Sequence, residues 1–410
     1  MTRAISRRVA SASCRRQHGL GTLGMCLVLL TVLGLGATWA ARQLASAQRV
    51  AANDVRGAAA AEAAEAGIAW TIAMLNTGRV DDRCRPAVDA PGDSIPGAIA
   101  PERGPGDFRE RFLQVAADGY FRPRSASATG SASASGSASA SSSSGASTGT
   151  DASSAGGERP ADWLAHCVNT GPLRWLCRCG GERVNASSGS EPTSAQPMFW
   201  IRFADGGTAG VLKLLVRACS DHARDCEDLS DGPRGAAEVS QQLALLSALR
   251  RPPQASTLEG PGTFMQLFGM PPARYRSQPA VTRLRCDADC GPVLAQALAR
   301  GRRLLWIDGD ARISSLPASA FEGPALVLIA TGRLDMSTSG SLRGLLYARD
   351  GVRWHPSAGM AASLQGALAS DGVIDRAPQV NVAHDTEVLQ QISRRMGSYL
   401  PVPGGWTPTR

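Results

Sequence analysis

Lysine and aromatic residues are scarce in this sequence of 410 residues. Lys213 is its single lysine, so arginine carries nearly all of the positive charge. Aromatic residues make up 5% of the chain, and they do not alternate with basic residues along any stretch. A surface that binds nucleic acid usually combines a basic patch with such aromatic side chains. We therefore expect no direct nucleic-acid binding, in spite of a formal net charge of +8.

Motifs that carry enzymatic chemistry are also missing. The sequence has no P-loop, no dinucleotide-binding glycine fingerprint, no GxSxG and no HExxH. His166 precedes Cys167, but a cysteine acts as a nucleophile only when its thiol is free. Asp308, Asp310 and Arg312 have the residue types of a polysaccharide lyase site, and their place beside glycine explains them equally well as turn residues. We expect no enzymatic activity, no cofactor and no metal. An acidic cluster that fits no EF-hand spacing is expected to be a solvated loop: Asp221, Asp225, Glu227, Asp228 and Asp231.

Formal charge is absent over the 22 residues Leu20–Ala41. As a helix this segment would be about 33 Å long, enough to cross a hydrocarbon core of about 30 Å. Five of the eight net positive charges precede the segment, so the positive-inside rule places this end in the cytoplasm and the rest of the chain in the periplasm. Those five charges are Arg3, Arg7, Arg8, Arg15 and Arg16.

This N-terminus can be compared with three kinds of processing signal. A secretory signal would be cut near Thr38–Ala40, which matches a cleavage site poorly. A lipoprotein signal would place Cys26 after the apolar core, whereas most of the apolar residues follow it. A prepilin leader is short and basic, ends in glycine and is cut before the apolar helix, which fits cleavage between Gly19 and Leu20.

The helix is expected to continue beyond the apolar segment, over residues 42–78. This stretch is rich in alanine and lacks proline before Asn76-Thr77-Gly78, a plausible helix stop. The alternative is a separate soluble helix that begins near Gly57. One apolar stripe recurs at three- and four-residue steps and comprises Ala61, Ala64, Ile68, Ile72 and Leu75.

The segment from Gly19 to Asn76 resembles the N-terminal part of PilX-type pilus assembly proteins. In that family a basic leader ending in glycine precedes a long apolar helix, which closes on a segment like Ala63–Trp70. The resemblance implies a minor pilin of a type IV pilus, cut by a prepilin peptidase. Its partners would be other minor pilins, pilus assembly proteins and a tip adhesin.

One departure from the major pilins is informative. Major pilins carry Glu as the fifth mature residue, where this chain has Gly24. That Glu is thought to neutralise the terminal amine of the neighbouring subunit within the membrane, where a lone charge is costly. A subunit without Glu would suit the filament tip or a priming complex, unless Gly24 only reflects packing.

Eight of the ten cysteines follow the apolar segment and read as a disulfide framework in an oxidising compartment. Close spacing suggests the local bridges Cys219–Cys226 and Cys286–Cys290, which leaves the other four to share two bridges. A zinc site is the weaker interpretation, because Cys177 and Cys179 are one residue apart and no histidine pair follows. The eight are Cys84, Cys167, Cys177, Cys179, Cys219, Cys226, Cys286 and Cys290.

The remaining chain reads as mostly β. Residues 125–157 are a Ser/Ala/Gly insertion that cannot bury apolar surface, and Cys84 and Cys167 on either side could close it into a loop. Two apolar runs, Met198–Phe203 and Val211–Arg217, predict a hairpin. Residues 238–250 are ambiguous between helix and strand, and residues 292–300 predict a short helix.

The C-terminal third contains a weak repeat. Leu304–Gly309 is echoed 22 residues later by Leu326–Gly332, and Leu342–Leu346 by Leu364–Leu368. A period near 20 with glycine punctuation predicts a small β-solenoid, with an antiparallel sheet as the alternative. This region also resembles the end of PilX-type proteins, although its closing motif Pro403–Trp406 carries an additional glycine.

These observations predict an α+β protein of the inner membrane with a periplasmic body. The expected parts are a leader (1–19), a transmembrane segment (20–41), the periplasmic continuation of the helix (42–78), a disulfide-stapled β-rich region (79–300) and a solenoid (301–410). The expected function is initiating or capping type IV pilus assembly, with incorporation into the pilus as a further step. A type II secretion pseudopilin and a membrane-anchored carbohydrate-binding solenoid are the alternatives.

Overall fold

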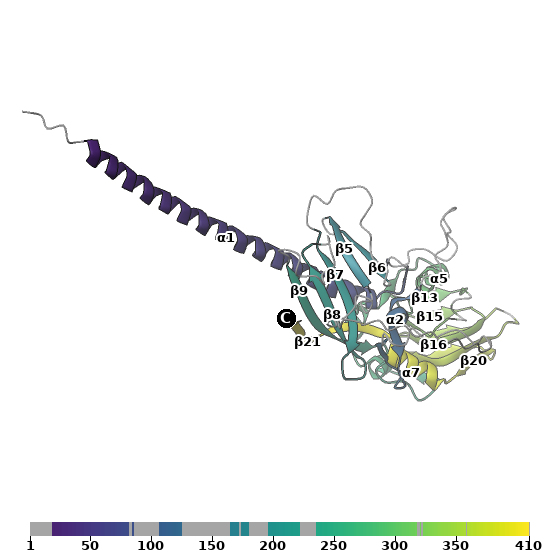
Figure 1. Cartoon of the computed structure of the whole chain (residues 1–410). Helices are drawn as coiled ribbons and strands as arrows, with labels where there is room; N and C mark the ends of the chain where they lie inside the picture. The colour runs from purple at the N-terminus through teal and green to yellow at the C-terminus, as the bar shows by residue number, and fades with distance from the viewer. Residues whose placement is uncertain are drawn as a thin grey trace, which may run out of the picture. The chain divides into compact units, whose positions relative to one another are not determined.

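The computed structural model describes residues 19–81, 84–85, 106–124, 165–171, 174–179, 196–221, 235–317, 320, 323–357 and 359–409. The chain divides into two units, Met1–Arg56 and Gly57–Arg410, which are described separately. Nearly all of the predicted leader and the whole Ser/Ala/Gly insertion lie outside the described residues. What is described is a long helix, an antiparallel sheet and a parallel β-solenoid (Figure 1), so the α+β class is confirmed.

Helix α1 (Gly19–Leu75) is continuous, so the alternative of a break at Gly57 is wrong. Alanine and unbranched side chains favour this length of helix, and no proline interrupts it. Within the first unit, every residue from Gly21 to Val55 is exposed. The helix ends at Leu75, directly before the predicted stop Asn76-Thr77-Gly78.

A six-stranded antiparallel sheet forms the first half of the body, in the order β21-β9-β8-β7-β5-β6. Its strands β7 and β8 are the predicted hairpin, with Ile201 opposite Val216. The ambiguous segment at 238–250 is largely strand β9, which has hydrogen-bonded strands on both sides. The strands are β5 (Ala165–Gly171), β6 (Arg174–Cys179), β7 (Met198–Asp205), β8 (Val211–Cys219), β9 (Ala236–Ser247) and β21 (Gly397–Thr409).

The second half of α1 packs on one face of this sheet. Inward residues alternate along β7 and β8, as expected for a sheet with one face on the core. The predicted stripe is wrong in part, because Ala61 is exposed while Gly67 and Thr71 are buried. Small residues allow the helix to approach closely, and the Thr71 hydroxyl is satisfied by the Gly67 carbonyl at 2.7 Å. The predicted stripe counted apolar residues only, so it did not detect a buried helix face that includes glycine and threonine.

Gly67 sets the distance between α1 and the sheet. A Cβ at this position would lie 2.6 Å from Val216 Cγ1 and 3.0 Å from Phe199 Cδ2. We expect Gly67→Leu to lower the free energy of unfolding by about 1–3 kcal/mol, because the core would be overpacked. Gly57→Leu is the matched control, since nothing lies within 4 Å of that position, and it should raise helix stability by a few tenths to about 1 kcal/mol. Chemical unfolding checks both, and equal effects would contradict the packing argument.

The second half of the body is a parallel β-solenoid, so the alternative of an antiparallel sheet is wrong. Each coil gives one strand to a larger sheet and one to a smaller sheet. The stacking register is Leu342 opposite Leu364, as the 22-residue repeat predicts, but Leu304 lies opposite Val327, one residue later than predicted. The coils are β12 (Leu304–Ile307) with β13 (Ala311–Ile313), β14 (Leu326–Ala330) with β15 (Leu334–Met336), β16 (Gly340–Ala348) with β17 (Val352–Trp354), and β18 (Ala362–Ser370) with β19 (Ile374–Arg376).

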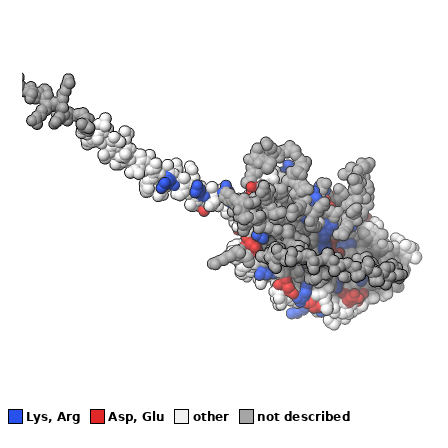
Figure 2. Space-filling view, in the orientation of Figure 1, with Lys and Arg blue, Asp and Glu red and all other residues white. Residues whose placement is uncertain are grey.

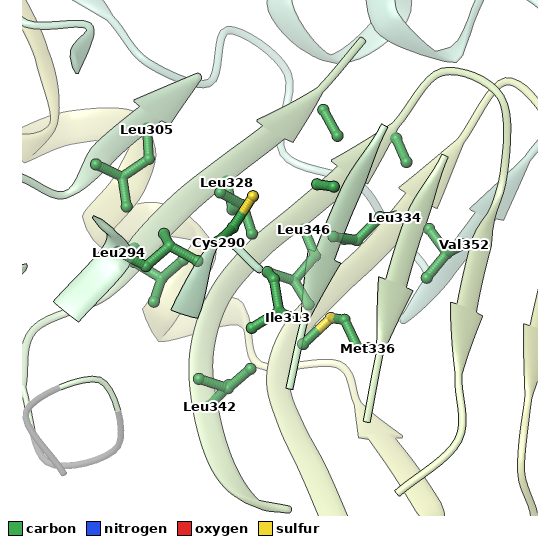
Figure 3. Close-up of a cluster of buried hydrophobic side chains, with 14 of the residues drawn as sticks. Cys290, Leu294, Leu305, Ile313, Leu328, Leu334, Met336, Leu342, Leu346 and Val352 are labelled. Atoms are coloured by element: carbon green, nitrogen blue, oxygen red, sulfur yellow. The ribbon is translucent and has the colours of Figure 1, made fainter. Parts of the chain in front are cut away.

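Apolar side chains fill the space between the two solenoid sheets (Figure 3). Leu305, Leu328 and Leu346 stack from the larger sheet towards residues of the smaller one, such as Leu334 and Val352. The opposite face of the larger sheet is covered as well, which is why its strands read as continuous apolar runs. Its cover is formed by α3 (Thr263–Phe268), α4 (Pro272–Arg276) and α7 (Thr386–Arg395).

Both ends of the larger sheet are covered by additional elements. At one end β11 (Thr282–Leu284) pairs with β12, and α5 (Gly291–Ala299), the predicted short helix, joins them. At the other end β10 (Thr257–Glu259) and β20 (Val380–Ala383) both pair with β18. The solenoid therefore does not coincide with residues 301–410: it begins earlier, and β21 returns to the antiparallel sheet beside β9. Short elements complete the body: β1 (Arg79–Val80), β2 (Gly106–Asp107), α2 (Phe108–Phe112), β3 (Leu113–Val115) and β4 (Phe121–Pro123).

Candidate functional site

The first candidate is the exposed apolar surface of α1. The helix is long and apolar enough to cross a membrane by length and composition. Figure 2 shows an uncharged stretch of helix followed by positive patches, and the first charged residue after Gly19 is Arg42. Within the stretch, the hydroxyls of Thr31 and Thr38 donate to helix carbonyls three residues earlier, at 2.8 and 2.9 Å. These two polar side chains are therefore satisfied by the helix itself, as an apolar surrounding would require.

The predicted processing positions lie at the start of this helix. Gly19 is the first residue of α1, and Leu20 follows it inside the helix. Gly24 lies about one turn further, and apart from its chain neighbours and the adjacent helix backbone nothing lies within 4 Å of where its Cβ would be. Packing within this chain therefore does not require glycine at the fifth position counted from Leu20.

The second candidate is the junction at the C-terminal end of α1, where Asn76 joins the helix to β21. The Asn76 Nδ2 group donates to the carbonyls of Ile72 at 2.8 Å and Tyr399 at 2.9 Å. Its Oδ1 accepts the backbone N–H of Tyr399 at 2.9 Å. Sequence reasoning assigned Asn76 only to a helix stop. In the fold its side-chain amide bonds both the N–H and the carbonyl of Tyr399, 323 residues away, and so pairs with β21 much as a neighbouring strand would.

Arg109, on α2, is the centre of this junction. Its guanidinium donates to three backbone carbonyls: Nε to Leu75 at 2.6 Å, Nη1 to Arg395 at 2.9 Å and Nη2 to Gly397 at 2.6 Å. Leu75 and Arg395 are the last residues of α1 and α7, so one cation caps two helix C-termini. The guanidinium carbon also lies 4.8 Å from the centre of the Tyr399 ring.

Burial dominates the electrostatics of this junction. Burial lowers the pKa of the Arg109 guanidinium, and the neighbouring Tyr399 and Asp107 oppose that shift. Burial likewise raises the pKa of Asp107, against the charge and the backbone N–H of Arg109. Asp107 caps α2 by accepting that N–H at 2.8 Å. Opposite charges are therefore close together here: Asp107 is the half-buried N-cap of α2, and Arg109 is buried in the first turn of that helix.

The same junction reaches the solenoid. Arg302 Nη1 donates to the Asn76 carbonyl at 3.0 Å, and the Arg79 N–H donates to the Arg300 carbonyl at 2.9 Å. Gly78 allows this approach, since a Cβ there would lie 2.3 Å from the Arg300 oxygen. The end of α1 is therefore bonded to both halves of the body.

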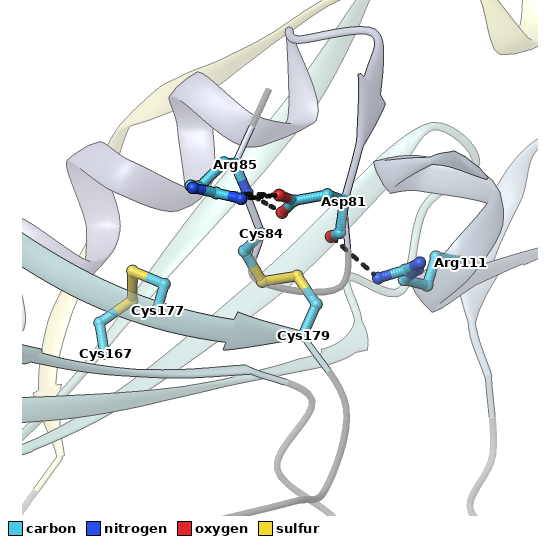
Figure 4. The surroundings of a disulfide bond; sticks show 7 residues. All are labelled: Asp81, Cys84, Arg85, Arg111, Cys167, Cys177 and Cys179. Carbon is cyan, nitrogen blue, oxygen red and sulfur yellow. Dashed lines mark hydrogen bonds and ion pairs between the residues drawn. A yellow bond between two sulfur atoms is a disulfide. The ribbon is translucent and has the colours of Figure 1, made fainter. Parts of the chain in front are cut away.

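Disulfides tie the chain that follows α1 to the edge of the antiparallel sheet (Figure 4). Cys84 pairs with Cys179 at the end of β6, and Cys167 pairs with Cys177 between β5 and β6. Closure of the insertion by a Cys84–Cys167 bridge is therefore wrong, because β5 and β6 place Cys167 directly opposite Cys177. Beside Cys84, the Asp81 carboxylate accepts the Arg85 side chain at 2.9 Å.

The other bridges are local where the structure describes them. Cys286 pairs with Cys290, four residues away, as the spacing predicts. Cys219 is disulfide-bonded, and Cys226 lies outside the described residues. Cys26 is a free, exposed cysteine within the apolar stretch of α1.

Removing the long-range bridge should cost more than removing a local one. We expect the double substitution Cys84→Ser, Cys179→Ser to lower the free energy of unfolding by about 3 kcal/mol, because the bridge closes a loop of 95 residues in the unfolded chain. The control pair Cys286→Ser, Cys290→Ser opens a loop of four residues and should cost about 2 kcal/mol less. Denaturant unfolding of both variants checks this difference, and the reverse order would contradict it.

Cys167, Asp308 and Asp310, which the sequence offered as candidates for catalysis, are bonded to other residues of the fold. Cys167 is bridged, so its thiol is not free. Asp308 accepts hydrogen bonds from Arg276, Arg283 and Trp306 at 3.0, 3.0 and 2.9 Å. Burial raises the pKa of Asp308, but these donors outweigh burial and bring it to about 2. Asp310 accepts the N–H of Arg333, and Arg312 is exposed. Of the acidic cluster at 221–231, only Asp221 lies within the described residues.

Arg109 escaped the sequence analysis because nothing in the run FRERF distinguishes a buried arginine from a solvated one. Among the described residues, no group of three or more His, Cys, Asp or Glu is arranged to hold a metal ion. Comparison with protein-family models, with curated proteins and with solved structures finds no match for this chain. The functional argument therefore depends on the geometry of α1 and the body.

Proposed function

We propose that the chain is a minor pilin-like subunit that helps to initiate or cap assembly of a type IV pilus. The observation that supports this most directly is the division of one helix into two surfaces. Its first half exposes an uncharged apolar face, and its second half is docked on an antiparallel sheet by small residues. Such a helix can anchor a subunit in the inner membrane and pack against neighbouring subunits, while the disulfide-bonded body remains in the periplasm.

N-terminal sequencing of the membrane-bound protein tests this proposal. We expect the mature chain to begin at Leu20, the second residue of α1, after cleavage by a prepilin peptidase. Substitution Gly19→Ala in a host with that peptidase should leave the leader attached. A mature chain that begins near Ala40, or a soluble product without the apolar segment, contradicts the proposal.

Gly24 supports placement at the tip or in a priming complex. Without Glu at the fifth position, the subunit cannot neutralise the terminal amine of a subunit ahead of it within the membrane. Since nothing surrounds Gly24 in this chain, we expect Gly24→Glu to fold normally and to shift the subunit from the tip into the filament. Immunogold labelling along the pili measures this shift, with Gly21→Glu as the matched control. Labelling that is unchanged, or equally changed in both variants, contradicts the tip placement.

A further inference from the structure

A pocket rich in arginine lies beside the end of α1, on the solenoid half of the body. It opens between β11, α5 and the turn that leads into β12, and Thr77 forms part of its wall. Its volume is about 570 Å³, enough for several side chains of another molecule. We call it the arginine pocket. Its five arginines are Arg79, Arg283, Arg285, Arg300 and Arg302.

No acidic residue is among the described residues that line the arginine pocket. Asp308 neutralises one of its charges, through Arg283 at 3.0 Å, and Arg79 and Arg300 make contacts of their own. A positive excess nevertheless remains at Arg285 and Arg302. Burial lowers the pKa of Arg302, and the charge of Arg300 lowers it further, so like charges are crowded here.

A purely structural role explains only part of this set. Arg300 is the C-cap residue of α5, where a cation is favourable to the helix dipole. Arg302 donates to the Asn76 carbonyl and so belongs to the junction. Neither reason applies to Arg285, whose exposed side chain directly follows β11. Arg283, exposed on β11, has an ion pair with Asp308, whose side chain is itself partly exposed, so both guanidinium groups remain accessible to a ligand.

The lining indicates what kind of ligand fits. Val281, Leu284, Val293 and Ala297 contribute apolar side chains to the lining of the arginine pocket. A phosphate backbone needs no apolar lining, and the described residues of the lining include no aromatic residue on which a base could stack. A protein segment that carries carboxylates beside an apolar side chain fits both the arginines and the apolar lining residues. A guanidinium can bind a carboxylate through two parallel hydrogen bonds.

We propose that the arginine pocket binds an acidic, partly apolar segment of a partner protein. The site lies on the body, next to the point where α1 is bonded to both halves. It is therefore independent of the apolar surface of α1, and the proposal does not depend on the pilus assignment.

The test measures binding of a fluorescent 12-residue peptide of Glu, Leu and Ala to the full-length protein in detergent, against a blank of micelles alone. We expect saturable binding that weakens as salt rises, and no comparable binding of the same peptide with Gln in place of Glu. The double substitution Arg283→Gln, Arg285→Gln should weaken binding about tenfold. The control pair Arg312→Gln, Arg353→Gln, on exposed solenoid strands, should leave it within about twofold.

A further variant, Arg302→Gln, and a second ligand, an oligonucleotide, distinguish binding of an acidic peptide from binding of a phosphate. Arg302→Gln should also weaken peptide binding, and thermal unfolding will show whether the junction is intact in that variant. Equal weakening by the two double substitutions, or equal binding of the Gln peptide, overturns the proposal. A single-stranded oligonucleotide that binds more tightly than the Glu peptide, and is lost with the same arginines, overturns it in favour of a phosphate ligand.

Discussion

Substitution Arg109→Met is expected to lower the free energy of unfolding by about 4 kcal/mol or more. Methionine preserves much of the volume but removes every donor, which leaves the carbonyls of Leu75, Arg395 and Gly397 without their buried partner. Each orphaned buried acceptor costs about 1–3 kcal/mol. The half-buried carboxylate of Asp107 would also lose the favourable electrostatic effect of the Arg109 charge. Denaturant unfolding of the full chain in detergent measures the loss.

Two further variants of the same kind make this result specific. Arg109→Lys retains the charge but has a single nitrogen in place of the three, so it should recover only part of the stability. Arg353→Met removes an exposed arginine whose ion pair with Asp375 spans 3.7 Å, and it should cost under about 1 kcal/mol. If Arg109→Met behaves like Arg353→Met, the junction at the end of α1 does not hold the body together.

Local patterns in the sequence predicted the principal elements of this fold but not the short ones around them, such as α2, α3, α4 and α7. The uninterrupted alanine-rich run predicted one helix, and it is continuous from Gly19 to Leu75. Alternating apolar runs predicted the hairpin of β7 and β8, since one buried face requires a period of two residues. Glycine-punctuated apolar runs predicted the solenoid, because stacked coils bury apolar residues between their two sheets.

Contacts between distant segments could not be predicted in this way. The bridge from Cys84 to Cys179 and the pairing of Asn76 with Tyr399 join residues that no local pattern relates. The return of β21 to the antiparallel sheet depends on the free edge of β9, which a sequence does not display. The same limit hid Arg109, whose three acceptors come from three different parts of the chain. The junction at the end of α1 is therefore a product of the tertiary fold.

The two halves of the body differ in what stabilises them as well as in topology. The antiparallel half contains the Cys84–Cys179 and Cys167–Cys177 bridges and the docked part of α1, so it holds the helix covalently and by packing. The solenoid half depends on the parallel stacking of successive coils. Its stability is consequently most sensitive to a residue that disturbs the stacking itself.

Gly344 is that residue, and Gly344→Ala is expected to lower the free energy of unfolding by more than about 4 kcal/mol. Its φ of +146° is one that L side chains rarely adopt. A Cβ at this position would also lie 1.9 Å from the carbonyl oxygen of Leu326, on the strand beside it. Backbone cannot yield as a flexible side chain would, so β14 and β16 would have to separate. Denaturant unfolding followed by near-ultraviolet circular dichroism, to which the buried solenoid residues Trp306 and Trp354 contribute, measures this loss of stability.

Gly309→Ala separates the two causes of that loss. Gly309 also has a positive φ, +88°, but nothing lies within 4 Å of its missing Cβ. It should therefore show only the conformational cost, about 1–2 kcal/mol. A much larger loss at Gly344 assigns the difference to the contact with Leu326. Gly366 repeats the geometry one coil later, because a Cβ there would lie 2.0 Å from the Gly344 oxygen. Gly366→Ala should therefore lower the free energy of unfolding about as much as Gly344→Ala. Both glycines lie at the same position on adjacent strands of the stack.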